Sequence, residues 1–440
     1  MTISLDRVGR RADTAVPARP GSARTGLALT YLAAATVPWT GARLGPIAFG
    51  DVFLVFAAMA LVGADLHRPW PRLPGWVWAL VVTVVVTAVT NQFAPPSLHY
   101  LISRDQLYDN YMVVHTATST ITNLTVMVPL VARLILLPFV FSLARAIEPQ
   151  ALYRAVNAFV AGVAIDAAIA FTDSRGITSI GPSLTGIPVD AQRAAGLTQH
   201  PNVVAMTCVF ALPLVIWQAR SAKGRHRMLV LFALLLILLG LYASRSRSGA
   251  AAAAVAGAVA LAWLPQYRRF LPTLALLFAS LAALLFVANP GSGAALLRGL
   301  RLVGGGDTSG SDEARSIVND QAVRDFLHSP IHGIGLEFAE QAHMVYLQAL
   351  AVGGVILLAG LVIFLGGALV RCARLARVEP LAIPLFVAVL GGAIFNAAQN
   401  ALTPAVVYVM EGLVAALPLA AGGRAPIATS TRAGREEDVE

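Results

Sequence analysis

Apolar runs of about twenty residues recur along most of this chain, and they constrain its fold more than any other feature. A helix needs about 20 apolar residues to cross a hydrocarbon core that is ~30 Å thick. Hydrophobic residues make up 57% of the 440 positions and charged residues only 12%, whereas about 25% of a soluble domain is charged. The strands of a membrane barrel would be shorter and would alternate in polarity. We therefore predict an all-α, polytopic transmembrane bundle, because a helix pairs its backbone groups within one segment.

The apolar runs predict about 12 helical spans. Spans one to nine fall within residues 25–289, and spans ten to twelve fall within 344–421. Residues 290–343, between these two groups, are expected to form one large non-cytoplasmic loop. The segments 1–24 and 422–440 are expected to be cytoplasmic tails, the first of them disordered. The predicted spans are 25–40, 46–65, 74–94, 119–144, 151–171, 201–219, 227–243, 249–265, 270–289, 344–370, 381–400 and 404–421.

Inside the large loop, residues 314–328 have the periodicity of an amphipathic helix. Val318, Ala322 and Phe326 fall on one stripe of that helix, and Pro330 follows its end. We expect the helix to lie across the top of the bundle.

The basic residues indicate the orientation of the spans. With both ends of the chain placed inside, the cytoplasmic segments hold 21 Lys and Arg residues and the outward segments hold ten. This is the bias that the positive-inside rule describes. The formal net charge of +9 does not indicate a nucleic-acid partner, because the basic residues are scattered over short loops and form no single patch.

Three outward segments combine arginine and histidine at span boundaries. Residues 193–202 read Arg-Ala-Ala-Gly-Leu-Thr-Gln-His-Pro-Asn, and they precede the sixth span. Residues 244–249 read Ser-Arg-Ser-Arg-Ser-Gly and form the short connection between the seventh and eighth spans. The third segment starts with His-Ser-Pro-Ile-His-Gly-Ile-Gly at 328–335 and continues with His-Met-Val-Tyr-Leu-Gln at 343–348, where the tenth span opens.

Arginine at an outward membrane boundary runs against the positive-inside trend. Arg245 taken alone fits two interpretations equally well. It has a functional role, or its side chain only reaches out to lipid phosphates. Arg193 and Arg247 together favour a functional interpretation, because guanidinium binds phosphate in a bidentate manner. The Ser-rich turn adds backbone N–H donors at a helix start, and these donors also favour anions.

The histidines are weaker indications when each is taken alone. A lone histidine at a helix start is usually a cap or a packed residue, and this applies to His200, His332 and His343. The carboxylates of 307–313 are spaced loosely in a Gly/Ser-rich stretch, which favours a solvated loop over a cation site. We therefore expect no metal site.

The order of these motifs resembles the O-antigen ligase and O-antigen polymerase superfamily of bacterial membrane proteins. The shared features are an arginine before His-Pro-Asn, a Ser-Arg-x-Gly turn, a large outward loop with Pro-x-x-Gly-x-Gly, and His-Asn-x-Tyr-Leu-Gln at a span start. The resemblance covers about residues 190–365. Two positions depart from the family pattern: Met344 replaces the usual Asn, and Ser248 is an extra residue in the turn.

The resemblance implies roles for particular residues. Arg193 and Arg247 would bind the pyrophosphate of the donor. His343 would be the catalytic base or would orient the acceptor, and Arg315 looks like the family's loop arginine. Further candidates of lower rank are Arg245 and His200, together with Tyr346 of the tenth-span motif.

The implied activity is a glycosyl transfer that needs no cofactor. A polyprenyl-diphosphate-linked glycan would be the donor, and a hydroxyl of a lipid, a polysaccharide or a protein would be the acceptor. Arginines in a water-poor site stabilise the diphosphate that leaves, and a neutral histidine takes the proton of the hydroxyl. The enzyme would work at the outer face of the bacterial cytoplasmic membrane, in contact with membrane lipid.

Other functions stay open at this stage. A polymerase of the same superfamily would use the same chemistry. A transporter or flippase for lipid-linked sugars would also need charges inside the membrane, but transporters often show two similar halves, and this chain shows no convincing internal repeat. A sensor or scaffold offers no reason for arginines and a histidine at the outer boundary.

A few polar residues fall inside the predicted spans. Arg133 lies in the middle of one, where it must face the bundle interior or a wet cavity. We expect Asp166 of the next span to be its partner, whereas Asp51 is either structural or part of a cavity lining. Gln399 and Glu411 are expected to form hydrogen bonds between helices.

Overall fold

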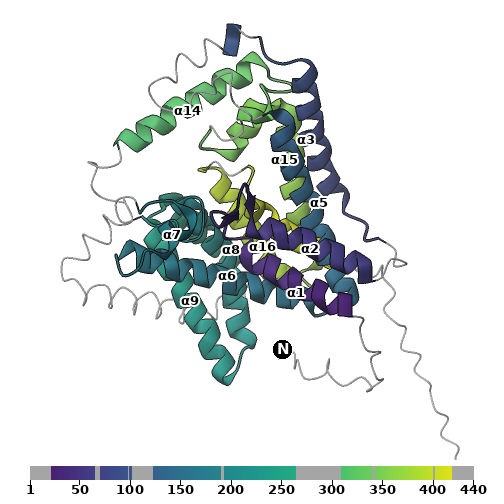
Figure 1. Cartoon of the computed structure of the whole chain (residues 1–440), viewed down its shortest axis with the longest axis vertical. Coiled ribbons are helices and arrows are strands. Elements are labelled where there is room, and N and C mark those ends of the chain that lie inside the picture. The colour runs from purple at the N-terminus through teal and green to yellow at the C-terminus, as the bar shows by residue number, and fades with distance from the viewer. Residues whose placement is uncertain are drawn as a thin grey trace, which may run out of the picture.

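The computed structural model is a bundle of helices with a single short hairpin among its described residues (Figure 1). It describes residues 21–64, 70–97, 99–101, 122–189, 193–263, 309–338, 342–399 and 402–418. The elements up to residue 185 are α1 (Gly21–Thr36), β1 (Arg43–Leu44), β2 (Ile47–Ala48), α2 (Phe49–Ala64), α3 (Gly75–Phe93), α5 (Asn123–Ile147), α6 (Ala151–Ser174) and α7 (Ile180–Thr185). The later elements are α8 (Pro201–Ser221), α9 (Gly224–Ser244), α10 (Arg247–Trp263), α14 (Ser309–His328), η2 (Leu336–Phe338), α15 (Val345–Leu375), α16 (Ala382–Asn396), η3 (Ala405–Tyr408) and α17 (Val409–Ala415).

Six of the described helices are long and apolar enough to cross a membrane, as judged by length and composition: α3, α5, α6, α8, α9 and α15. The remaining predicted spans that the structure describes correspond to shorter helices. The helices α1, α2, α10 and α16 lie at predicted spans but are 15 to 17 residues long. The predicted span 270–289 and the tail 422–440 lie outside the described residues. Of the predicted N-terminal tail, residues 21–24 belong to α1.

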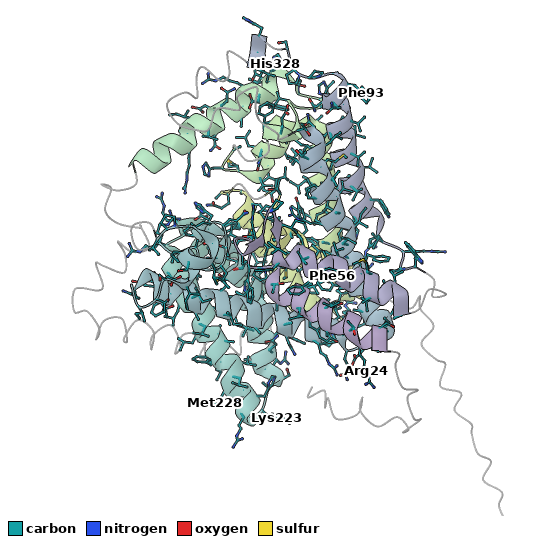
Figure 2. All side chains as sticks on the ribbon, in the orientation of Figure 1. Arg24, Phe56, Phe93, Lys223, Met228 and His328 are labelled. Carbon is teal, nitrogen blue, oxygen red and sulfur yellow. The ribbon has the colours of Figure 1, made fainter. Side chains whose placement is uncertain are left out.

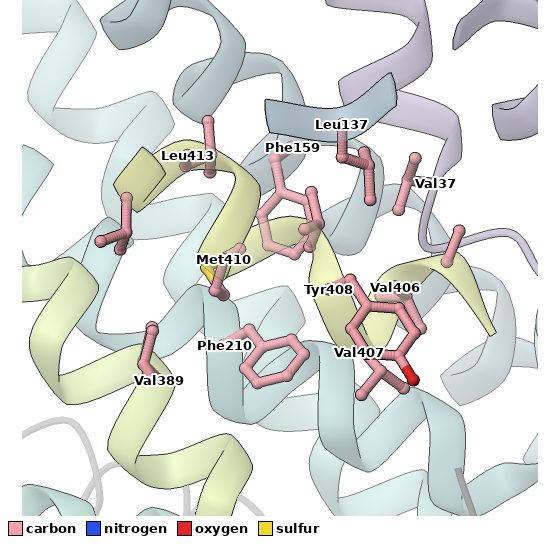
Figure 3. Close-up of a cluster of buried hydrophobic side chains, with 14 of the residues drawn as sticks. Val37, Leu137, Phe159, Phe210, Val389, Val406, Val407, Tyr408, Met410 and Leu413 are labelled. Atoms are coloured by element: carbon pink, nitrogen blue, oxygen red, sulfur yellow. The ribbon is translucent and has the colours of Figure 1, made fainter. Parts of the chain in front are cut away.

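The predicted span 404–421 begins as two short elements. The helical stretch runs through the 3-10 helix η3 and the α-helix α17 and covers Ala405–Ala415, a rise of only about 18 Å. Its side chains are buried along its whole length. Figure 3 shows Tyr408 and Met410 of this stretch in one cluster with buried side chains from α5, α6, α8 and α16. Arg145 and Arg371 donate to carbonyl oxygens at its end, which satisfies groups that a helix C-terminus leaves unpaired.

Close helix packing holds the bundle together. α1 packs against α2 and α6, and α6 packs against α8 and α9. At Gly162 a side chain would collide with the backbone of Ala35, so glycine lets α6 approach α1 closely. Small residues at helix contacts are typical of membrane bundles, where apolar burial between helices gives little driving force.

α15 is broken near its start, and the break holds the preceding loop. Gly354 has φ 61° and ψ −161°, a conformation that is essentially restricted to glycine. Ile334 and Gly335 donate to the carbonyls of Ala351 and Val352, at 2.9 and 3.0 Å. Val355 donates back to the Pro330 carbonyl at 2.9 Å. The Pro-x-x-Gly-x-Gly segment is thus hydrogen-bonded into the break, and it fixes the first turns of α15 relative to α14.

The contacts between loops join segments that the orientation analysis places on the same side. Tyr153 donates to Glu379 at 2.6 Å, and this bond links 145–154 with 371–380. On the other side, Gly41 donates to the carbonyl of Leu197 at 2.9 Å. In Figure 2, Arg24 and Lys223 lie towards one end of the molecule, and His328 and Phe93 lie at the opposite end.

Candidate functional site

Arg193 is held against the Ser-Arg turn that follows α9. The side chain is 9% exposed. Its Nε donates to the carbonyl of Ser244 at 3.2 Å, and its Nη2 donates to Oδ1 of Asn202 at 3.0 Å. The structure therefore brings the first two outward motifs together, although about fifty positions separate them in the chain.

A chain of amide and hydroxyl groups continues from Asn202 to the same turn. The Asn202 amide donates to Oε1 of Gln399 at 2.6 Å, and the Gln399 amide donates to Oγ of Ser248 at 2.8 Å. Gln399 is 3% exposed, so both ends of its side chain are buried and paired. The sequence predicts that Gln399 forms hydrogen bonds between helices. It does so, because it joins Asn202 of α8 to Ser248 of α10. Its link to Ser248 could not be anticipated, because nothing local in the sequence relates residues so far apart.

The turn itself presents two arginines. Arg245 ends α9 in a left-handed conformation with φ 48°, which a residue other than Gly, Asn or Asp adopts only at a free-energy cost. Arg247 opens α10, and both arginines are partly exposed. The Ser246 hydroxyl accepts from the N–H of Gly249 at 3.2 Å, as an N-cap residue does. Two guanidinium groups therefore stand at a capped helix start, beside the buried Arg193.

His200 has the structural role that applies to most histidines at a helix start. It is the N-cap of α8, and its Nδ1 accepts from the N–H of Asn202 at 3.1 Å. Pro201 follows at the first helical position, where a proline fits well.

His343 precedes α15 and is fixed by α14. Its backbone N–H donates to Oδ1 of Asn319 at 3.1 Å, and its Nδ1 is buried without a hydrogen-bond partner among the described residues. Arg315 lies one helical turn before Asn319 on α14, so the two share a face. The pKa of His343 is lowered from 6.5, first by burial and then by the positive charge of Arg315. The imidazole is therefore biased towards its neutral form, the form that accepts a proton.

Both groups of residues contact the C-terminal end of α16. Tyr346, in the first turn of α15, donates its hydroxyl to the carbonyl of Ala393 at 2.7 Å. Gln399, just beyond α16, accepts from the Asn202 amide and donates to the Ser248 hydroxyl. Tyr346 thus positions the start of α15 against the same short segment that organises Arg193 and the turn. The end of α16 and the residues just beyond it therefore contact both the start of α15 and the network that holds Arg193.

The expected ion pair of Arg133 with Asp166 is wrong. Arg133 pairs with Asp51 instead, at 2.6 Å from Nη2 to Oδ2, and it also donates to the carbonyl of Thr403 at 2.7 Å. Asp166 accepts from the N–H of Leu197 at 2.6 Å and so holds the loop that contains Arg193. Adjacent spans in sequence were not the partners, because the arrangement of helices in space places α2 beside α5.

The helix α14 corresponds to the amphipathic helix that the sequence predicts. α14 begins at Ser309, earlier than the predicted amphipathic helix, and it buries Val318 and Ala322 as the stripe predicted. Among the described residues, no three His, Cys, Asp or Glu side chains gather in a group that could hold a metal ion.

Comparison with known proteins supports a family for this region. Residues 232–362 match the family model described as O-antigen ligase. No curated protein matches the chain. The matched region holds the Ser-Arg turn, α14, His343 and the start of α15, and Arg193 is hydrogen-bonded to it from outside. Over residues 232–362, this chain is therefore similar to the O-antigen ligase family, which agrees with the resemblance of its motifs.

Proposed function

We propose that this chain is a membrane glycosyltransferase that moves a glycan from a polyprenyl-diphosphate donor to an acceptor hydroxyl of a lipid, a polysaccharide or a protein. One observation carries the proposal. Inside a region that matches the O-antigen ligase family, the arginine-bearing turn accepts a hydrogen bond from the buried Arg193. Ligation and polymerisation share this chemistry and differ only in the acceptor.

The proposed reaction exchanges one bond at the anomeric carbon. The acceptor oxygen forms a bond to that carbon while the bond from the carbon to the diphosphate oxygen breaks. The leaving group is the polyprenyl diphosphate, on which negative charge grows. Arg193 and Arg247, with Arg245 as a further contact, would hold this group and stabilise its charge without rearrangement.

His343 would accept the proton of the acceptor hydroxyl. Burial and the charge of Arg315 lower its pKa, so it is a base that is neutral at physiological pH. We further propose that the reaction proceeds without a bound metal ion.

The site would face the outside of the cytoplasmic membrane, with both chain ends in the cytoplasm and about 12 spans. Same-side contacts between loops support this topology, as do the opposite positions of Lys223 and His328 in Figure 2. Residues 290–343 would then form the large outer loop, in which α14 carries Arg315.

Replacing Arg247 tests the proposal. We expect Arg247→Ala to lower the rate of transfer by about 100-fold or more, because it removes a donor that stabilises the leaving charge. The measurement is turnover of a polyprenyl-diphosphate-linked glycan by the purified full-length protein, with and without a chelator. Arg24→Ala is the matched control, since Arg24 is an exposed arginine at the end of the molecule opposite His328.

Each result of this experiment leads to a different conclusion about Arg247 or about a metal ion. Normal membrane insertion with lost transfer supports the role of Arg247. Full activity of Arg247→Ala would remove the turn from the mechanism, and loss of activity on chelation would contradict a metal-free reaction.

A further inference from the structure

We call Arg193, Arg245 and Arg247 the arginine cluster. A small polar cavity opens near it, and nothing in the proposed chemistry uses this cavity. Its volume is about 50 Å³, several times the ~10–15 Å³ that one water molecule requires. The Asp51–Arg133 ion pair is part of its lining, and the two side chains remain 15% and 20% exposed. The lining residues are Val37, Thr40, Arg43, Ala48, Gly50, Asp51, Arg133, Gln199, Thr403, Pro404 and Ala405. We call this space the Asp51 cavity.

The lining offers both donors and acceptors of hydrogen bonds. Arg133 is already engaged, because its three nitrogens bind Asp51 and the Thr403 carbonyl. The Asp51 carboxylate keeps further lone pairs. Arg43 is exposed at the rim, where its Nε donates to the Thr40 carbonyl at 3.2 Å. The Asp51 carboxylate disfavours an anion in the cavity, whereas a hydroxyl group can donate to this carboxylate and accept from one of the two N–H groups of Arg133 that these bonds leave over.

The Asp51 cavity shares two walls with the arginine cluster. Gln199 lines the cavity, and Asn202 of the same short segment binds Arg193. Thr403 lines the cavity on another side, and Gln399 of that segment binds Ser248. The chain around Gln199 and the chain around Thr403 therefore contribute both to the cavity and to the hydrogen-bond network that holds Arg193.

We propose that the Asp51 cavity is a hydroxyl-binding subsite that receives one edge of a sugar ring of the glycan substrate. This inference rests on the proposed function and names a place where the carbohydrate part of a substrate is recognised. The volume admits two or three hydroxyl groups but not a whole oligosaccharide. The ring belongs either to the donor, next to its diphosphate, or to the acceptor, and the experiment distinguishes these two sources.

Filling the cavity is the sharpest test. In Ala48→Phe a benzyl side chain projects from the cavity wall, whereas Ile47→Phe places the same ring at an adjacent exposed position that does not line the cavity. The purified full-length protein is titrated with polyprenyl diphosphate alone and with the glycan-bearing lipid extracted from the expressing cells. A donor subsite predicts that Ala48→Phe weakens binding of the glycan-bearing lipid about tenfold, the loss of roughly one charged hydrogen bond. Binding of the sugar-free lipid should not change.

An acceptor subsite predicts a different pattern. Binding of both lipids is then normal, and the KM for the acceptor rises about tenfold in Ala48→Phe but not in Ile47→Phe. Arg43→Gln provides a second, exposed variant in case Ala48→Phe does not fold, with Arg24→Gln as its control, and it should weaken the same substrate. If neither variant affects either substrate, the cavity only solvates the ion pair, and the subsite is excluded. The two lipid titrations do not require turnover, so this result is separate from failure of the proposed reaction.

Discussion

Two side chains in this protein organise residues that the sequence places far apart. Arg193 binds the Ser244 carbonyl and Asn202, and Gln399 extends that network to Ser248. Each of these buried polar groups would cost free energy if it lost its partner. The network therefore holds the turn in a single arrangement, which is what preorganised stabilisation of a leaving diphosphate requires.

His343 differs from these groups because its ring nitrogen Nδ1 has no hydrogen-bond partner among the described residues and its charge state is adjustable. In its proposed role as general base it must be neutral, so transfer should fall as the pH drops through its pKa. That pKa lies below 6.5, so the acidic limb of kcat/KM should lie below pH 6.5. We expect Arg315→Gln to move this limb to higher pH, because the substitution removes a positive charge that disfavours the imidazolium. The measurement is the pH profile of transfer by the purified protein.

Arg324→Gln is the matched control for this charge change. Arg324 is an exposed arginine on the same helix, and it is not among the groups that shift the pKa of His343. An acidic limb that stays in place in Arg315→Gln, or that persists in His343→Ala, would assign the proton transfer to another group.

Among the elements, the broken helix α15 has the clearest connection to the site. Its first turns carry Tyr346 and follow directly from His343, and the break at Gly354 is hydrogen-bonded to the loop that leads from α14. An unbroken helix would have no free carbonyls at Ala351 and Val352 for this loop. The hydrogen bonds at the break therefore fix the start of α15, and with it His343, relative to α14.

Gly354→Ala should disturb this arrangement. A Cβ at Gly354 would meet the backbone of Pro330 and Ile331, and φ 61° is unfavourable for alanine. We expect a loss of about 1–3 kcal/mol of stability, together with a lower kcat because His343 is displaced. Thermal unfolding in detergent and turnover are the two measurements.

Gly366→Ala in the same helix provides the comparison. A Cβ there has nothing within 4 Å, and alanine is favoured over glycine in a helix by up to about 1 kcal/mol. Its stability should be unchanged or higher. Equal behaviour of the two variants would mean that the break has no structural role.

At the level of the whole molecule, the described loops fall into two groups of contacts, and each group joins segments that the proposed topology places on one side of the membrane. Tyr153, Glu379 and the end of α17 meet at one end, whereas Leu197, Arg193 and the Ser-Arg turn meet at the other. An enzyme that takes its donor from the outer leaflet needs its arginines and its histidine in the second group.

Cysteine labelling tests this orientation. The native Cys208 and Cys372 are both buried, so the background should be low. We expect Leu327→Cys, at a position 69% exposed on α14, to react with a membrane-impermeant maleimide in intact cells. Lys223→Cys, in the short connection before α9, should react only after permeabilisation. Reaction of both variants from the same side would overturn the proposed topology.

The membrane character and the functional motifs followed from local properties of the chain. Apolar length predicted helices at α3, α5, α6, α8, α9 and α15, because a helix pairs its backbone within one segment, whatever its neighbours. Three-dimensional packing decided which side chains meet. Arg133 pairs with Asp51 and not with Asp166, and Gln399 joins Asn202 to Ser248. Hydropathy and short motifs carry no information about which helix faces become neighbours, and the distance between two polar groups depends on that packing.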